Sequence, residues 1–143
     1  MNKLLILCGL LCFGAGSTVF AQADTTTTIT GLKYVRLRAG NGKKPQIGDK
    51  LKVLYTGKLT SGKVFDSSMD GTIPFKFKLG KGEVIPGWDE GFRLMSEGEK
   101  GVLIVPPHMA YGEEGSGYLK TADTYVVPPN STLIFEVELL KVK

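Results

Sequence analysis

The chain has 143 residues, of which 42% are hydrophobic, and its formal net charge at pH 7 is +4. This length suits one domain with a hydrophobic core of its own and excludes several such domains. The lysines stand singly or in pairs along the sequence, as at Lys43 and Lys44. Because nucleic-acid-binding proteins gather their basic residues on one face, we expect a solvated surface and no nucleic-acid partner.

The first 23 residues predict a secretory signal peptide. Lys3 supplies a positive charge, an apolar run follows from Leu4 to Phe13, and small residues precede two alternative cleavage positions, after Ala21 and after Ala23. The run falls short of the about 20 residues that a membrane-spanning helix needs. We therefore expect no membrane span, export to the periplasm or secretion, and a mature protein that begins near residue 24.

Residues 24–30 are polar and rich in threonine, and we expect them to form a flexible leader. The chain that follows has mainly the pattern of β-strands, with apolar and polar residues alternating between glycine-containing turns. The clearest alternation places Phe75 and Phe77 on one face and Lys76 and Lys78 on the other. Strands are expected at 32–37, 51–58, 64–65, 75–79, 102–105 and 133–140.

One segment has helical spacing. Ile85, Trp88, Phe92 and Met95 recur at intervals of three and four residues, and Gly98 is placed to end the helix. The pattern predicts a short helix of two to three turns with one apolar stripe. The expected fold class is therefore α+β: a twisted antiparallel β-sheet with one short α-helix packed on its concave face.

Groups for covalent or metal chemistry are scarce. Both cysteines, Cys8 and Cys12, lie in the predicted signal peptide, so the mature protein would have no thiol. The only histidine, His108, follows two prolines in an expected loop and has no carboxylates spaced as metal ligands. We therefore expect no metal, no cofactor and no nucleophilic catalysis.

Two short blocks predict a pocket. Val64–Ser68 places an aromatic next to a carboxylate, and Val84–Trp88 contains an aliphatic pair and the only tryptophan. Together they could line an apolar pocket with one polar wall, which suits an apolar, uncharged ligand such as a prolyl ring. The alternative is that these aromatics are ordinary core residues, because aromatic side chains dominate burial in a small domain. Composition alone leaves this choice open.

From Gly31 onward the chain closely resembles the FKBP-type peptidyl-prolyl cis-trans isomerases. The resemblance rests on many spaced blocks in the family order, a combination far more specific than any single block. These blocks are VLYTGKL at 53–59, GKVFDSS at 62–68, FKFKLG at 75–80, EVIPGWDEG at 83–91, MSEGEK at 95–100, AYG at 110–112 and VPPNSTLIFEVELL at 127–140.

The resemblance implies that residues 24–143 form one isomerase domain, a half-barrel sheet around a short helix, in which a prolyl ring sits over the Trp88 indole. The Ile85 backbone N–H would donate to a substrate carbonyl. The residues expected to act on the rotating bond are Asp66, Tyr111, Phe65 and Phe135. The implied substrate-binding set is Tyr55, Phe65, Asp66, Phe75, Val84, Ile85, Trp88, Tyr111, Val126 and Phe135.

The implied activity needs no reactive group, because rotation about an Xaa-Pro bond breaks no covalent bond. The twisted amide is less polar than the planar one, so an apolar pocket should bind the twisted state more tightly. The resemblance thus implies an exported folding assistant. Its partners would be proline-containing, unfolded or partly folded polypeptides, and macrolide inhibitors would bind the same pocket.

Several features depart from the smallest or the dimeric family members. Segment 113–125 is longer than its counterpart in the smallest members, and we expect it to be flexible and to overhang the pocket beside Tyr111. Val126 and Val127 precede Pro128, where the family usually has an isoleucine, and valine keeps the apolar character with less bulk. Dimeric exported members carry a long helical region before the catalytic domain, whereas only about ten residues follow the cleavage site here. We therefore expect a monomer.

Two other functions stay open. The first is a module that binds proline segments, or a holdase chaperone, whose turnover is incidental and whose ligand binding would survive loss of turnover. The second is an unrelated secreted β-domain, which would not bind a proline-mimicking macrolide. The presence of the expected pocket residues favours the enzyme.

Overall fold

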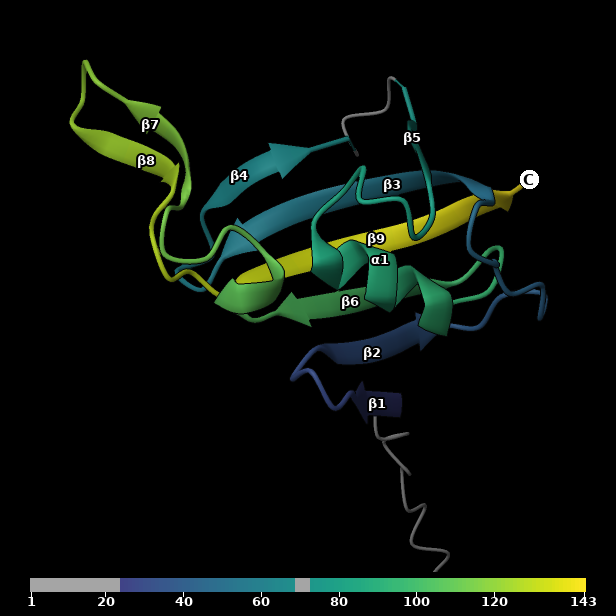
Figure 1. Cartoon of the computed structure of the whole chain (residues 1–143). Coiled ribbons are helices and arrows are strands. Elements are labelled where there is room, and N and C mark those ends of the chain that lie inside the picture. The colour runs from purple at the N-terminus through teal and green to yellow at the C-terminus, as the bar shows by residue number, and fades with distance from the viewer. Residues whose placement is uncertain (1–23, 69–72) are drawn as a thin grey trace, which may run out of the picture.

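The computed structural model describes residues 24–68 and 73–143, which fold into an antiparallel sheet with a short helix on one face (Figure 1). The predicted signal peptide at 1–23 lies outside these residues. Within the described ranges, every helix is too short or too polar to cross a bilayer. The helical segments are α1 (Pro86–Gly91) and the 3-10 turns η1 (Phe92–Leu94) and η2 (Pro107–Met109). The strands are β1 (Asp24–Thr27), β2 (Lys33–Arg38), β3 (Lys50–Leu59), β4 (Val64–Ser67), β5 (Phe75–Lys78), β6 (Lys100–Val105), β7 (Ser116–Leu119), β8 (Thr124–Val127) and β9 (Leu133–Val142).

Seven strands form the main sheet in the order β1-β2-β6-β9-β3-β4, and β5 also pairs with β3. β4 pairs with residues 56–58 of β3 and β5 pairs with residues 50–53, so β4 and β5 share one edge of β3. On its other edge β3 pairs with β9, which comes from the far end of the chain. An antiparallel sheet with one short α-helix on the described residues confirms the predicted α+β class.

Alternate residues of the strands point into one hydrophobic core. In β9, buried and half-buried residues alternate from Leu133 to Leu139, as the two-residue period predicts. In β3 the same period buries Leu51 and Val53 and turns the neighbouring lysines outward. All six predicted strands are present, and the helix covers their apolar face.

The predicted helix forms, but its regular part is shorter than expected. α1 begins at Pro86, whose fixed φ suits the first helical position, and continues as η1, which ends before the extended residue Met95. Gly98, expected to end the helix, lies beyond it in the turn that leads to β6. The apolar stripe is buried as predicted, at Trp88, Phe92 and Met95.

Two glycines of the helix let α1 lie directly on β6. A Cβ atom at Gly87 would stand 2.4 Å from Cγ1 of Val105, and one at Gly91 would stand 2.6 Å from Cδ2 of Leu103. Any larger residue at either position would push the helix away from β6. This close approach fixes the depth of Trp88, which lies between the two glycines in the sequence.

Two segments differ from their predictions. Residues 24–27, expected in a flexible leader, form β1 and pair with β2, because branched threonine side chains favour an extended backbone. The longer segment at 113–125, expected to be flexible, contains most of the hairpin β7–β8. The rings of Tyr118 and Tyr125 pack across this hairpin with centroids 4.9 Å apart. The hairpin projects from the body of the molecule (Figure 1).

Candidate active site

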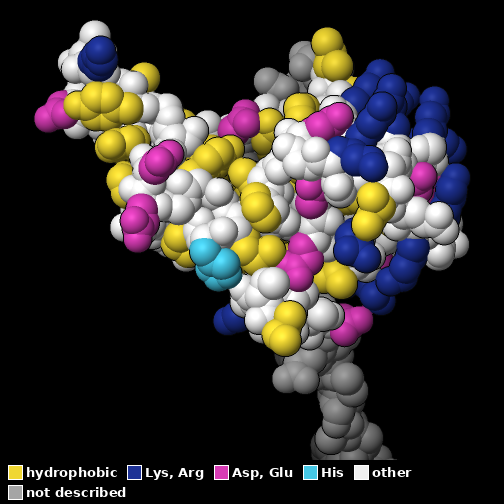
Figure 2. Space-filling view, in the orientation of Figure 1, with side chains coloured by type: hydrophobic (Ala, Val, Ile, Leu, Met, Phe, Trp, Pro, Cys, Tyr) yellow, Lys and Arg dark blue, Asp and Glu magenta, His cyan; other side chains and the backbone are white. Residues whose placement is uncertain are grey.

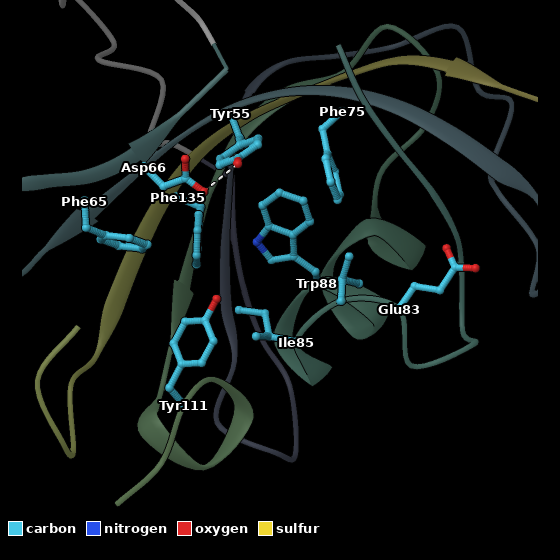
Figure 3. A pocket seen from close by; sticks show the side chains of 10 residues that line it. Tyr55, Phe65, Asp66, Phe75, Glu83, Ile85, Trp88, Tyr111 and Phe135 are labelled. Atoms are coloured by element: carbon cyan, nitrogen blue, oxygen red, sulfur yellow. Dashed lines mark hydrogen bonds between the residues drawn. The ribbon is translucent and has the colours of Figure 1, made fainter. Parts of the chain in front are cut away.

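A pocket of about 210 Å³ opens between the start of α1 and the strands beside it (Figure 3). Its side chains come from distant parts of the sequence, which the pairing of β3 with β4, β5 and β9 brings together. Tyr111, from the turn after η2, completes the rim. The lining residues are Tyr55, Phe65, Asp66, Phe75, Glu83, Val84, Ile85, Trp88, Tyr111 and Phe135.

Trp88 forms the floor of the pocket and is only 4% exposed. The ring centroids of Tyr55, Phe75 and Phe135 lie 4.9, 5.9 and 5.3 Å from its own, each ring nearly perpendicular to the indole. Such edge-to-face pairs add to the stability that burial gives. Phe92 packs against the same indole, so the floor is continuous with the core. A ligand therefore meets an apolar surface that folding has already organised.

Asp66 places a charged group beside the aromatic rings of the pocket wall. Its carboxylate accepts a hydrogen bond of 2.6 Å from the Tyr55 hydroxyl and one of 2.9 Å from the backbone N–H of Ser67. Asp66 is exposed at the mouth of the pocket, so a ligand can approach the carboxylate. The two hydrogen bonds hold the carboxylate in one orientation toward the aromatic rings (Figure 3).

Two tyrosine hydroxyls remain protonated at neutral pH. Burial, the hydrogen bond to Asp66 and the charge of Asp66 raise the pKa of Tyr55 well above its ordinary value. Burial, and then the charge of Asp66, also raise the pKa of Tyr111. Tyr55 uses its proton to bond Asp66, whereas the Tyr111 hydroxyl points into the pocket (Figure 3). Tyr111 is therefore a donor that a ligand can use.

Two further donors at the pocket have no hydrogen-bond acceptor among the described residues. Ile85 stands at the N-cap of α1, and its backbone N–H bonds to no other described group. The indole N–H of Trp88 is buried, has no partner in the same ranges and points into the pocket (Figure 3). Buried polar groups are normally paired, so unpaired donors around an apolar hollow are typical of a ligand site.

A hydrogen-bonded loop holds the segment that precedes α1. The Asp89 carboxylate accepts the backbone N–H of Gly80 at 2.8 Å and that of Gly82 at 3.1 Å. Both glycines have positive φ, 74° and 69°, which glycine adopts without strain. The loop is thereby tied to the first turn of the helix, and this fixes Val84 and Ile85 at the pocket rim.

Gly57 makes room for the two phenylalanines of the pocket wall. A Cβ atom at this position of β3 would stand 2.6 Å from Cζ of Phe65 and 2.9 Å from Cε1 of Phe135. The two rings meet over the bare backbone, with centroids 5.7 Å apart and planes nearly perpendicular. Gly57 is therefore a structural requirement of the site, although it offers no functional group.

The structure places nine of the ten residues predicted to bind substrate around this pocket. The exception is Val126, which lies half-buried in β8. Glu83 also lines the pocket and was not predicted, although it directly precedes the predicted pocket residue Val84 in the sequence. None of residues 113–125 lines the pocket, so the expected overhang is absent, because β7 and β8 pair with each other and project away. His108 is exposed and its Nε2 lies 2.8 Å from the carbonyl oxygen of Thr30, outside the pocket lining.

Comparisons with known proteins agree on one family. The family model described as FKBP-type peptidyl-prolyl cis-trans isomerase matches residues 41–140. The peptidyl-prolyl cis-trans isomerase Fkbp12 of Drosophila melanogaster is 49% identical over 114 residues, which cover 79% of this chain and 99% of that protein. An FK506-binding protein of Neisseria meningitidis serogroup B is 49% identical over 112 residues, 78% of this chain and 96% of the relative.

Solved structures give the same result. The crystal structure of AtFKBP13 superimposes with a TM-score of 0.76 at 36% identity, over 85% of this chain and 100% of its own. FkpA from Escherichia coli superimposes with a TM-score of 0.72 at 41% identity, over 86% of this chain. FkpA is the longer protein, and the match spans 53% of it.

Proposed function

Because the chain belongs to the FKBP-type peptidyl-prolyl cis-trans isomerases, we propose that it catalyses rotation about Xaa-Pro peptide bonds in the pocket above Trp88. The observation that carries this assignment is the apolar, organised pocket with unpaired hydrogen-bond donors at its floor and rim. This arrangement suits a ligand that is apolar in its middle and has carbonyl acceptors at its ends, which is the chemistry of a prolyl segment.

The reaction requires that the pocket bind the twisted amide more tightly than the planar one. Rotation about a peptide bond has a barrier of about 18–20 kcal/mol, because the twist destroys amide resonance. The twisted amide has less charge separation than the planar one. Moving it from water into an apolar site therefore costs less free energy than moving the planar amide there. Lowering the barrier by about 5 kcal/mol accelerates rotation several-thousand-fold.

We assign the roles of individual residues from their placement. The prolyl ring lies on the Trp88 indole, between the walls formed by Phe65 and Phe135. The free N–H of Ile85 donates to a substrate carbonyl and anchors the chain on one side of the rotating bond. This anchor leaves the other side free to turn.

The polar groups act on the part of the substrate that turns. The Tyr111 hydroxyl, a donor that points into the pocket, bonds the carbonyl as it leaves the amide plane. The Asp66 carboxylate, which the Tyr55 hydroxyl holds in place, orients the substrate and stabilises the amide nitrogen in the twisted state. Neither group transfers a proton, because the reaction does not need one.

The predicted signal peptide supports the proposal that the protein acts outside the cytoplasm. Export would place the domain, residues 24–143, in the periplasm or outside the cell, where its substrates are proline-containing exported proteins that have not finished folding. Slow Xaa-Pro isomerisation limits the folding of such proteins, so the enzyme assists folding. We propose that it works there as a monomer, and that macrolides occupy the same pocket as the prolyl segment.

The first experiment measures the cis-to-trans rate of a short Xaa-Pro-Phe peptide with and without residues 24–143. We expect strong acceleration that a pocket-binding macrolide abolishes and that the Asp66→Val variant loses in large part. Asp24→Val, which removes an exposed carboxylate on β1, serves as the matched control and should retain the rate. A folded domain that binds the macrolide without accelerating rotation would instead be a proline-binding module.

A further inference from the structure

The sheet assembles a patch of six lysines that the sequence keeps apart. Lys76 and Lys78 of β5 stand opposite Lys52 and Lys50 of β3, and Lys141 of β9 stands opposite Lys52 on its other side. The backbone of Lys143 exchanges hydrogen bonds with that of Lys50. We call Lys50, Lys52, Lys76, Lys78, Lys141 and Lys143 the lysine patch. Figure 2 shows Lys and Arg side chains covering this end of the molecule, near the C-terminus in Figure 1.

The charges of the lysine patch are almost unpaired within the described chain. Its one ion pair joins Lys141 to Glu97, at a distance of 3.8 Å. Two other cations of the same sheet are paired: Lys58 with Glu136 at 3.1 Å, toward the far end of β3, and Arg38 with Glu138 at 2.7 Å, beside the patch. Within the described residues, five of the six lysines of the patch therefore have no ion pair.

This clustering costs stability, because like charges directly opposite each other on a sheet repel. The charges of Lys143 and Lys76, together with slight burial and the charge of Lys141, lower the pKa of Lys52. Protection of an exposed strand edge explains lysines on β5, which pairs with β3 alone. It does not explain those on β3, which at residues 50–53 is paired with β5 on one edge and with β9 on the other.

The composition of the lysine patch narrows the choice of partner. The outward positions of these strand segments contain no arginine, which binds phosphate as a planar fork, and no aromatic on which a base could stack. At the patch β3 is paired on both edges, with β5 and with β9. The second edge of β9 is covered there by Glu97, which accepts the Val142 N–H, and by Lys43, which donates to the Val142 carbonyl, so a peptide cannot add as a strand to β3 or β9. The only recognition groups on the lysine patch are therefore its flexible ammonium groups, spread over a broad face of the sheet.

We propose that the lysine patch docks the domain on a membrane surface rich in anionic phospholipid. A field of flexible ammonium groups matches a surface whose negative charges are mobile and have no fixed geometry. The inward positions of β3 and β5 carry Tyr55 and Phe75 of the pocket, while the lysines occupy the outward positions of the same strands. A docked domain therefore keeps its pocket off the membrane and open to substrate.

The test is sedimentation of residues 24–143, which contain every described element, with vesicles of phosphatidylglycerol and phosphatidylcholine at low salt. Each lysine near such a surface contributes about fivefold to partitioning, so the triple variant Lys52→Gln, Lys76→Gln and Lys141→Gln should bind about 100-fold more weakly. Raising the salt to about 0.5 M should release the unmodified domain, because exposed charges are then screened.

The matched control removes the same charge from elsewhere on the same sheet, as Lys33→Gln, Lys58→Gln and Lys100→Gln. It should bind the anionic vesicles at least tenfold more tightly than the patch variant. Both triple variants should keep the circular dichroism spectrum and the peptide rotation rate of the unmodified domain. This separates docking from the activity of the pocket.

Three outcomes would overturn the proposal. Equal binding to vesicles of phosphatidylcholine alone would show that charge is not responsible. An equal loss in both triple variants would show that net charge, and not the lysine patch, matters. Binding to polyglutamate or to single-stranded nucleic acid without binding to anionic vesicles would assign the surface to a different class of partner.

Discussion

The Tyr55 hydroxyl donates a hydrogen bond of 2.6 Å to the Asp66 carboxylate across two neighbouring strands. The pairing of β3 with β4 sets this contact, because Gly57 stands opposite Asp66 and Tyr55 precedes it on the same face by two residues. Asp66 thereby has a fixed direction although it lies at the exposed mouth of the pocket. The Tyr55–Asp66 hydrogen bond thus links the Asp66 carboxylate to the floor of the pocket, through the ring contact between Tyr55 and Trp88.

Replacing Tyr55 by phenylalanine should leave the fold intact and lower kcat/KM by about tenfold, which corresponds to about 1.4 kcal/mol and lies near the range for a hydrogen bond to a charged group. The matched control is Tyr118→Phe, which removes the same kind of bond, from Tyr118 to Asp123 in the projecting hairpin. Rotation rates of a short Xaa-Pro-Phe peptide measure both. Equal rates for the two variants would show that the Asp66 orientation does not matter.

Adding one methyl group at Gly57 should disturb the pocket more than its size suggests. Gly57→Ala forces Phe65 or Phe135 to move, because the new Cβ would stand 2.6 Å and 2.9 Å from their rings. We expect a loss of about 1–3 kcal/mol in the free energy of unfolding, and weaker macrolide binding. Thr56→Ala, one residue earlier and on the outer face, should keep its affinity for the macrolide. Titration calorimetry and urea unfolding check this pair, and unchanged affinity in Gly57→Ala would contradict the packing argument.

Truncation of Trp88 should damage stability and turnover together. The indole contacts the rings of Tyr55, Phe75 and Phe135 on the pocket side and that of Phe92 toward the core, so Trp88→Ala should lose about 3–5 kcal/mol of unfolding free energy. Trp88→Phe refills part of this volume, and it should recover most of the stability but less of the rotation rate. Full rates in a folded Trp88→Ala protein would show that the prolyl ring lies elsewhere.

The buried tyrosines predict how stability depends on alkaline pH. The pKa of Tyr34 is raised by burial and by its hydrogen bond to Glu99, and that of Tyr55 by burial and Asp66. In the unfolded chain these hydroxyls ionise near pH 10, whereas the folded protein keeps them protonated, so their contribution is complete below about pH 10 and declines as the pH rises above it.

Urea unfolding at about pH 8 and about pH 11 measures this decline. Tyr34→Phe removes one of the groups, so its stability should fall less steeply with rising pH than that of the unmodified domain. The two proteins share every other titratable residue, and the comparison therefore isolates the tyrosine. Parallel pH curves would rule out the predicted linkage.

The strands and the helix stripe were predictable because each pattern has one strong period. Phe75 and Phe77 alternate with lysines, and Trp88, Phe92 and Met95 repeat with helical spacing; both sets lie on the faces that these periods assign. The β7–β8 hairpin was not predicted, since its strands have four residues each and the rings of Tyr118 and Tyr125 meet across it only when the strands pair. Spacing in the sequence gave no sign of that contact.

The pocket residues could be named in advance because the family resemblance supplied them, and the pocket gathers all of them but Val126. Two other features needed the pairing register. Gly57 matters only because β4 and β9 bring Phe65 and Phe135 over it. The lysine patch likewise arises from the alignment of β5, β3 and β9, whereas along the sequence its members are separate.

The projecting hairpin makes the chain a practical scaffold for fusion. Its base is closed by a hydrogen bond of 2.8 Å from the Asn130 N–H to the Gly112 carbonyl, and its tip at 120–123 is fully on the surface. Because the two ends of this hairpin segment lie close together, a polypeptide inserted at its tip adds little entropy cost of loop closure. A peptide tag or a small client-binding module can therefore replace the tip, giving the isomerase a chosen target without altering any residue of the pocket lining.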